Sequence, residues 1–306
     1  MNDNERAIVE LLDDGTLYAA PNLIEELFNY PDLSDSYLLV SRDQKGVPTG
    51  YIPIGINRMG TIASYIPAIP PSPPISPTYT PGAAHVIADL ENLLERSILY
   101  FDVDVVPRHS ERSYLEETAS AYCLSIDEYL SQLSKSRRKD FKRKLKVAKK
   151  YEVIEGTLDD VQAGWSWMKA VWEKRGAYDK EHIGRVLNWL REIEKTARAT
   201  MKIDKYLLDG KPVAVNCCVI HEFHGDIHID DYLTWYDAEV VSGLGIVTAI
   251  NNLTNPKYKG ARYNLGLPGF YGKTFAGHEY KWAIIPESIR LHQSIINIQA
   301  EIGLVS

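Results

Sequence analysis

The stretch from Asp226 to Phe275 constrains the fold more strongly than any other part of the chain, because it predicts a strand, a glycine turn, a helix and a second strand in succession. The first strand, Asp226–Tyr236, alternates apolar and polar residues with the period of two that is typical of strands. Its apolar face consists of Ile227, Ile229 and Leu233. Its polar face consists of His228, Asp230, Tyr232 and Thr234. A polar face on a strand of this kind indicates the lining of a cleft.

The glycine turn is a candidate phosphate-binding site. It consists of Ser242, Gly243, Leu244, Gly245 and Ile246. The turn opens an apolar run that continues to Leu253 and stops before Asn255-Pro256. Two glycines at the start of a helix let the backbone approach an anion, and the free N–H groups and the dipole of the helix favour phosphate there. The second strand, residues 261–265, follows this helix.

The order and spacing of these pieces resemble the GNAT superfamily of acyltransferases, in its FemAB-like branch. That fold places a Gln/Arg-x-x-Gly-x-Gly/Ala turn after its fourth strand, where the turn holds the pyrophosphate of coenzyme A. The matching segment Val240–Gly245 keeps both glycines and lacks the leading Gln or Arg. An aspartate-leucine-glycine element of the branch is similar to Asn264-Leu265-Gly266, without the acid. Its later tyrosine and lysine are similar to Tyr271 and Lys273.

The resemblance implies an α/β fold with a mixed sheet, built as two tandem GNAT-like acyltransferase domains. Two helices followed by a strand pair begin the chain, with Asn22 as the expected N-cap of the second helix, and the same order recurs after residue 150. We therefore expect an N-terminal domain on the acceptor side over residues 1–124. A basic linking helix is expected over 125–150, and a C-terminal donor-binding domain over 151–306.

Composition indicates a soluble globular protein, since 45% of the residues are hydrophobic and 25% are charged. The N-terminus lacks the basic and apolar profile of a signal peptide, and no apolar run approaches the roughly 18–20 residues that span a bilayer. Three cysteines, Cys123, Cys217 and Cys218, indicate neither a disulfide framework nor a CxxC metal site. We expect a cytoplasmic protein without a membrane span.

One segment is strongly basic. Residues 135–150 contain ten Lys or Arg and one acid, so they carry +9, which leaves −16 for the remainder of a chain whose net charge is −7. Phe141, Leu145 and Ala148 form a narrow apolar stripe, which predicts an amphipathic helix with a cationic outer surface. Its partner is expected to be the 3′-phosphate of coenzyme A, tRNA, or a phosphorylated or lipid-linked acceptor. Arg137 and Arg138 are the candidate donor contacts, and a solvated helix between domains is the alternative.

Acyl transfer from a thioester to an amine needs a proton acceptor for the amine and a proton donor for the thiolate. Asp230 is the preferred base and His228 the second candidate, with a structural role for the imidazole as the alternative. By the resemblance, Tyr271 is the acid and Lys273 contacts the donor phosphate or the oxyanion. A structural tyrosine and a surface lysine are the alternatives for these two.

A metal is not expected, although four side chains near one hairpin suit zinc or iron. They are His221, Glu222, His224 and His228. Their spacing lies across a turn, which scatters them over both faces of the strands.

Two further features lie in the first half. Asp102 and Asp104 share the polar face of a predicted strand, as an acid–base pair or as surface acids. Seven prolines in the sixteen residues from Ile66 to Pro81 exclude helix and central strand. They predict an ordered loop, with a lid or a ligand for a proline-recognising domain as alternatives.

We therefore expect an N-acyltransferase that moves an acyl group from acyl-CoA, acetyl-CoA or longer, to the amine of a small molecule or peptide. The nearest alternative is FemAB-type peptide-bond formation with aminoacyl-tRNA as the donor, which the basic helix favours. The other alternative is a non-catalytic module that binds nucleic acid or anionic lipid through that helix. The missing Gln or Arg before the glycines keeps this last alternative open.

Overall fold

The computed structural model describes residues 1–29, 33–57, 62–64, 81–82, 85–86, 115–174, 182–223, 225–241, 243–264 and 279–284. Outside these lie the proline-rich segment up to residue 80, Asp102, Asp104, His224, Ser242, Tyr271 and Lys273. The chain divides into two compact units. The first comprises Met1–Ala68, Pro74–Thr118 and Tyr280–Ser306, and the second comprises Ile69–Pro73 and Ala119–Glu279. The second unit holds the glycine turn and the basic helix.

In the first unit, two helices pack on a three-stranded antiparallel sheet of order β1-β2-β3. Its elements are α1 (Asp3–Leu12), a 3-10 turn η1 (Leu17–Ala19), α2 (Pro21–Phe28), β1 (Leu33–Arg42), β2 (Pro48–Asn57) and β3 (Ile62–Ser64). A capping box between Asn2 and Glu5 starts α1. The expected N-cap of α2 is wrong: it is Ala20 rather than Asn22, because Pro21 occupies the first helical position, where its missing N–H costs little.

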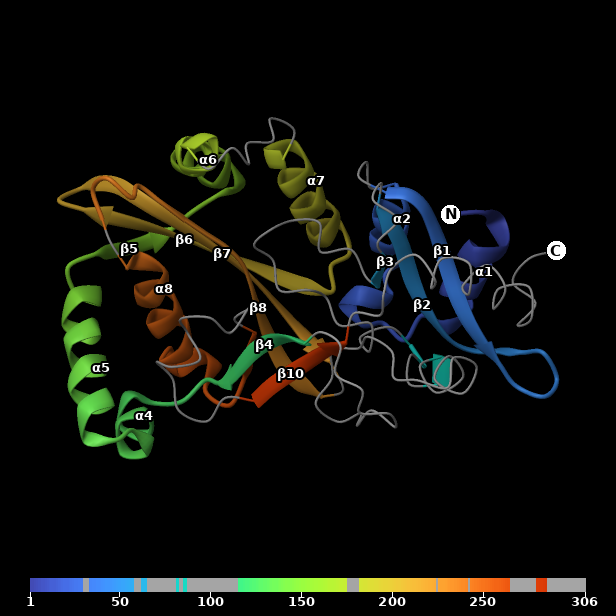
Figure 1. Cartoon of the computed structure of the whole chain (residues 1–306), viewed down its shortest axis with the longest axis horizontal. Coiled ribbons are helices and arrows are strands. Elements are labelled where there is room, and N and C mark those ends of the chain that lie inside the picture. Colours follow the sequence, from blue (N-terminus) through green and yellow to red (C-terminus); the bar gives the residue numbers. More distant parts are fainter. Residues whose placement is uncertain are drawn as a thin grey trace. The chain divides into compact units, whose positions relative to one another are not determined.

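The second unit is a sheet with helices on both faces (Figure 1). Its strands are β4 (Leu115–Tyr122), which begins in the first unit, β5 (Glu152–Glu155), β6 (Ala199–Leu208), β7 (Lys211–Phe223), β8 (Asp226–Tyr236) and β9 (Arg262–Asn264). Its helices are α4 (Ile126–Gln132), α5 (Lys135–Ala148), α6 (Leu158–Lys174), α7 (His182–Lys195), α8 (Leu244–Leu253) and the 3-10 turn η3 (Pro256–Tyr258). A last strand, β10 (Glu279–Ile284), is the edge strand of this sheet, although its residues from Tyr280 onward are counted with the first unit.

The sheet has the strand order β10-β4-β9-β8-β7-β6-β5. Strands β5 to β8 pair antiparallel in succession, β4 is antiparallel to β9, and β8 is parallel to β9. A parallel pair needs a crossover, and α8 provides it. The glycine turn follows β8, the fourth strand counted from β5, which is the place that the resemblance predicts. The α/β class with a mixed sheet is confirmed, whereas the tandem duplication stays a prediction.

One face of this sheet carries α4, α5 and α8, and the other carries α6 and α7. On the first face, Ile250 and Leu253 of α8 share a buried cluster with Phe141 of α5 and Tyr129 of α4. On the second face, the ring of Trp165 from α6 lies 5.4 Å from that of Trp235 on β8.

The close approach of α6 to the sheet depends on a glycine. A Cβ at Gly164 would lie 2.7 Å from Val215 Cγ1, so the contact has no room for a larger residue.

Helices α5 and α8 run antiparallel. Phe141, in the first half of α5, packs in the cluster that contains Leu253 at the end of α8. Ala148, at the end of α5, packs with Leu244 at the start of α8. The end of the basic helix therefore lies next to the glycine turn, and its beginning lies at the opposite end of α8.

Within the described ranges, no helix combines the length and the apolar character that crossing a membrane requires. Cys123, Cys217 and Cys218 are all buried free thiols.

Candidate functional site

The glycine turn starts α8 with a left-handed residue. Gly243 is the N-cap at φ 69°, ψ 20°, a conformation that residues with a Cβ rarely adopt. A Cβ at this position would meet nothing within 4 Å, so glycine is required for its backbone conformation and not for space. The first turn of α8 has neither a side-chain cap nor an acid. The N–H of Ile246 donates to the carbonyl oxygen of Gly243, whereas the N–H groups of Leu244 and Gly245 donate to no acceptor among the described residues, and the positive dipole end favours an anion there.

A β-bulge lies in β8 immediately before this turn. Leu233 pairs with Cys217 and Asp231 pairs with Cys218, so Tyr232 is one extra residue on β8. The parallel pairing of β8 with β9 ends at Asp230↔Asn264. Within the described residues, the edge of β8 from Asp231 to Tyr236 on the β9 side has no strand partner, and we call this segment the open edge.

The bulge corrects the predicted faces of β8. Tyr232 accepts a hydrogen bond from Trp189 Nε1 of α7 at 3.3 Å. Thr234 lies 3.3 Å from the hydroxyl of Thr248 on α8, between the two Oγ1 atoms. Residues 232 and 234 thus face opposite sides of the sheet, although a regular strand would place them together. Thr234 therefore does not belong to the polar face of His228 and Asp230.

The two predicted bases, Asp230 and His228, lie in one buried cluster and are 3% and 2% exposed. Asp230 is bound to a third residue, since its Oδ2 lies 3.0 Å from His221 Nε2. The rings of His221 and His228 are 5.5 Å apart, and Phe223 packs edge-on against His228 at 5.8 Å. From the sequence, His221 was expected only as a metal candidate. This cluster is closed, so a substrate amine would have no direct access to Asp230.

Asp231, a neighbour that sequence reasoning missed, lies on the α8 side of the bulge. Its Oδ2 accepts a hydrogen bond from Tyr263 Oη at 2.7 Å, and its Oδ1 accepts one from Asn216 Nδ2 at 2.7 Å. Unlike the buried Asn216 and Tyr263, Asp231 keeps partial exposure. It stands where β8 leaves β9, at the start of the open edge.

Asn252 of α8 forms hydrogen bonds with both partners of Asp231. Its Nδ2 lies 3.0 Å from Asn216 Oδ1 and 3.1 Å from Tyr263 Oη. Its Oδ1 accepts a hydrogen bond from Lys202 Nζ at 2.8 Å, and Lys202 also pairs with Asp204. A buried asparagine inside the apolar run of α8 was the sequence signal for this network. We call the set Asp231, Asn216, Asn252, Tyr263 and Lys202 the Asp231 network.

Burial sets the protonation of the network. It raises the pKa of Asp231 from 3.8 to about 6, although the hydrogen bonds from Tyr263 and Asn216 act in the opposite direction. Burial and the nearby Asp231 raise the pKa of Tyr263 well above its usual value, so the phenol keeps its proton and donates it. Burial likewise raises the pKa of Cys218, which remains a thiol and not a nucleophile. Asp231 is thus a carboxyl that exchanges a proton near neutral pH.

The structure does not bring Arg137 and Arg138 to the glycine turn. Both lie in the first turn of α5, and Arg138 donates to the carbonyl oxygen of Leu133 at 3.1 Å. The distance along the helix axis from Arg138 to Lys149 is about 16 Å. Lys149 and Lys150 follow the end of α5 that packs beside Leu244, so they are the cations of this segment nearest to the turn.

The remaining predicted residues have the following places. Leu244 and Ile246 are buried in the first turn of α8, and Gly245 is partly buried. Ser242, Tyr271 and Lys273 lie outside the described residues. No group of three or more His, Cys, Asp or Glu side chains that could hold a metal occurs in the part of the chain that is described.

Comparison with known proteins gives similarity in three-dimensional structure alone. No family model and no curated protein matches the chain. A tandem GNAT protein from the clavulanic acid biosynthesis pathway aligns with a TM-score of 0.43 at 11% identity, over 92% of this chain and 94% of its own. FemX aligns with a TM-score of 0.47 at 11% identity, over 96% of this chain and 98% of its own. A conserved protein of unknown function from Bacteroides thetaiotaomicron aligns with a TM-score of 0.47 at 12% identity, over 93% of this chain and 98% of its own. Because these TM-scores lie below 0.5, the proposals that follow depend on this chain's own residues.

Proposed function

We propose that the chain is an acyltransferase that moves an acyl group from an acyl-CoA thioester to an amine acceptor. The observation that carries the proposal is the left-handed Gly243 N-cap of α8, which follows the open edge of β8 after a connection of six residues. This arrangement provides an extended backbone edge followed along the chain by a site for an anion. Acyl-CoA has the matching chemistry, with a pyrophosphate at one end of an amide-containing arm and a thioester at the other.

The donor would bind in two parts. Its pyrophosphate would accept hydrogen bonds from the first N–H groups of α8, with Lys149 and Lys150 supplying nearby positive charge. Its pantetheine amides would pair with the edge of β8 beyond Asp230, as an extended peptide pairs with a sheet edge. The edge from Asp231 to Tyr236 spans about 17 Å at the usual rise per residue, so the thioester would lie near the bulge.

Asp231 is the proposed proton acceptor at that position. The amine nitrogen attacks the thioester carbonyl carbon, the C–N bond forms and the C–S bond breaks. The proton of the amine passes to the Asp231 carboxylate, and the thiolate leaves and takes up a proton. Because the pKa of Asp231 is raised to about 6, its carboxylate is a stronger base than an ordinary aspartate and is still ionised at neutral pH.

Other roles from the sequence analysis remain part of the proposal. Tyr271 would protonate the thiolate, and Lys273 would contact the donor phosphate or the oxyanion. Asp230, bound to His221, and the adjacent His228 would support the strand that carries Asp231. The acceptor would be a small-molecule or peptide amine.

Thermal unfolding in the presence of coenzyme A, acetyl-CoA and charged or uncharged tRNA tests the donor. A ligand at about 100 times its Kd stabilises by roughly 2.7 kcal/mol, which is a shift of several degrees for units of this size. We expect a shift with coenzyme A and acetyl-CoA, followed by release of free thiol when amines are supplied. A shift with aminoacyl-tRNA and none with coenzyme A would refute the thioester donor and favour the tRNA-dependent alternative.

A further inference from the structure

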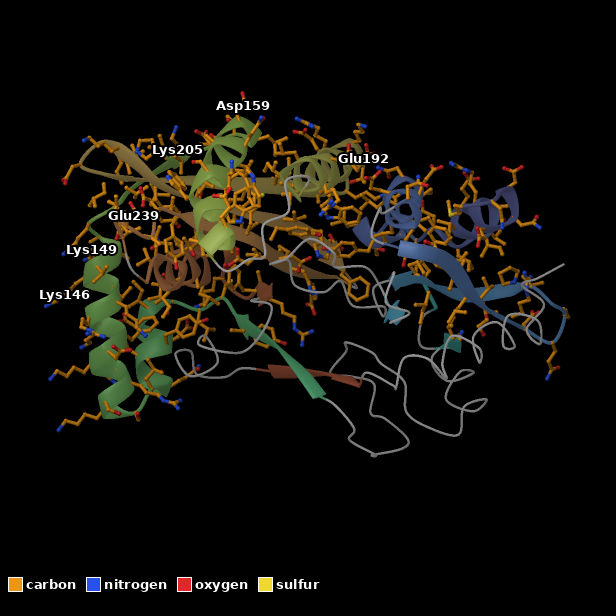
Figure 2. The ribbon with its side chains drawn as sticks, turned by 45° about the horizontal axis from the view of Figure 1, so that its top comes forward. Lys146, Lys149, Asp159, Glu192, Lys205 and Glu239 are labelled. Carbon is orange, nitrogen blue, oxygen red and sulfur yellow. The ribbon has the colours of Figure 1, made fainter. Side chains whose placement is uncertain are left out.

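The outer face of α5 carries a straight row of lysines. Lys135, Lys139, Lys142 and Lys146 follow the spacing i, i+4, i+7, i+11, which aligns them along one side of the helix. All four are exposed, and among the described residues none of them forms an ion pair. We call these four residues the lysine row. Figure 2 shows Lys146 and the neighbouring Lys149 extending from α5 away from the helices and strands beside it.

The lysine row costs stability locally. Like charges at i, i+4 destabilise a helix by about 0.2–0.5 kcal/mol per pair, and cations in the first turn oppose the helix dipole. The single acid of α5, Asp140, pairs with Arg143 at 2.8 Å and Lys144 at 2.7 Å, so it does not compensate the row. Helices α1 and α4, by contrast, have acids in the first turn. Folding therefore does not explain the lysine row, and an anionic partner does.

The lysine row borders a hollow on the surface. The hollow has a volume of about 720 Å³. Its described lining consists of the four lysines, Ser136, Arg138, Asp140 and Arg143. The lining thus holds six cations, one hydroxyl donor and one acid, which suits phosphate groups.

Among the described residues, the segments that flank this helix in the chain expose three aliphatic side chains and one aromatic one, Tyr122, which is 42% exposed and has Arg262 over its ring. Ile126 of α4 is 40% exposed, and Val153 and Ile154 of β5 are 41% and 39% exposed. The one aromatic residue of α5, Phe141, is 1% exposed. Single-stranded nucleic acid is held by exposed aromatic rings on which bases stack, whereas a lipid surface is held by cations together with aliphatic side chains. The exposed residues therefore favour a lipid surface.

We propose that α5 and its flanking residues dock the protein on an anionic phospholipid bilayer. The lysine row and the hollow would bind headgroup phosphates. Ile126 and one of the two consecutive β5 residues Val153 and Ile154, whose side chains point to opposite faces of the strand, would contact the apolar boundary beneath them. The proposal concerns where the protein acts and does not depend on the acyl-transfer chemistry.

Vesicle co-flotation tests the proposal with the full chain. Vesicles of phosphatidylcholine with about one third phosphatidylglycerol are compared with pure phosphatidylcholine at low and high salt. The variant K135Q/K139Q/K142Q/K146Q removes the lysine row. A matched control, K45Q/K169Q/K195Q/K211Q, removes the same charge from exposed lysines elsewhere. Circular dichroism and thermal unfolding establish that both variants are folded.

We expect the wild type and the control to float with anionic vesicles at low salt, and less so at high salt. Each neutralised lysine of the row should weaken binding by about fivefold, so the row variant should remain unbound. Equal binding of the two variants, or equal binding to both vesicle types, would overturn the proposal. Binding of a labelled RNA through the lysine row, without vesicle binding, would overturn it in favour of a nucleic-acid partner.

Discussion

Replacement of Asp231 by asparagine should change how the stability of the protein depends on pH. In the folded protein, burial raises the pKa of Asp231 from 3.8 to about 6. The folded state therefore binds a proton more tightly than the unfolded state, and between about pH 4 and 6 it holds more protons. Stability falls with rising pH wherever the folded state holds more protons. The contribution of Asp231 is thus fully present below pH 4 and is lost as pH rises through 6.

The size of the effect follows from the shift. A change of one pKa unit corresponds to 1.36 kcal/mol, so the rise from 3.8 to about 6 makes a difference of about 3 kcal/mol over the whole titration, of which about 2 kcal/mol falls between pH 4 and pH 7. The asparagine side chain of the variant would be neutral at both pH values. In the variant, an amide would replace the carboxylate that accepts a hydrogen bond from Asn216 Nδ2. The change in this hydrogen bond adds a loss of stability that does not depend on pH.

Urea unfolding at several pH values between 4 and 7.5 measures this difference. The free energy of unfolding of the wild type, relative to the Asp231→Asn variant, should fall by about 2 kcal/mol as pH rises over this range. Asp209→Asn, in the exposed turn between β6 and β7, is the control and should run parallel to the wild type. Parallel curves for Asp231→Asn and the wild type would refute the raised pKa and, with it, the choice of Asp231 as base.

Three further predictions concern stability and use the same unfolding assay. Asn252→Ala should destabilise the protein by about 3 kcal/mol or more, because the buried Asn216 and Tyr263 each lose a hydrogen bond. Asn251→Ala should cost less than about 1 kcal/mol, and similar losses for the two variants would argue against the Asp231 network. Gly164→Ala should destabilise the protein by about 1–3 kcal/mol, because the added Cβ would contact Val215. Gly184→Ala should stabilise it by about 0.5–1 kcal/mol, because this position of α7 has open space around it. A change of the same sign in both variants would contradict the close packing of α6 on the sheet. The variant K135Q/K139Q/K142Q/K146Q should be more stable than the wild type by about 1 kcal/mol at low salt and by less at high salt, because it lacks the repulsion between lysines along α5. A loss of stability in this variant would contradict that repulsion.

Local patterns in the sequence predicted much of the fold. The alternation over Asp226–Tyr236 coincides with β8, and the apolar run to Leu253 coincides with α8 apart from its first residues. These features depend on residues close in sequence, whose periodicity and capping chemistry are visible without the fold.

The candidate site was less predictable, because a single bulge decides it. The extra residue Tyr232 reverses which residues share a face, and this moves Thr234 to the α8 side. Alternation alone assigned Asp230 to the cleft, whereas Asp231 stands at the open edge of β8 and Asp230 binds His221. The sequence also did not predict that α5 packs antiparallel to α8. Because of this packing, Lys149, rather than Arg137, lies near the glycine turn.

Calorimetric titration of coenzyme A tests the central claim, that the glycine turn of α8 holds the acyl donor. The wild type is compared with Gly243→Val and with Gly210→Val, a glycine in the β6–β7 turn at φ 75° that is strained to a similar degree by a Cβ. We predict that the wild type and Gly210→Val bind coenzyme A and that Gly243→Val does not. Equal binding by all three proteins, or no binding by the wild type, would contradict the account.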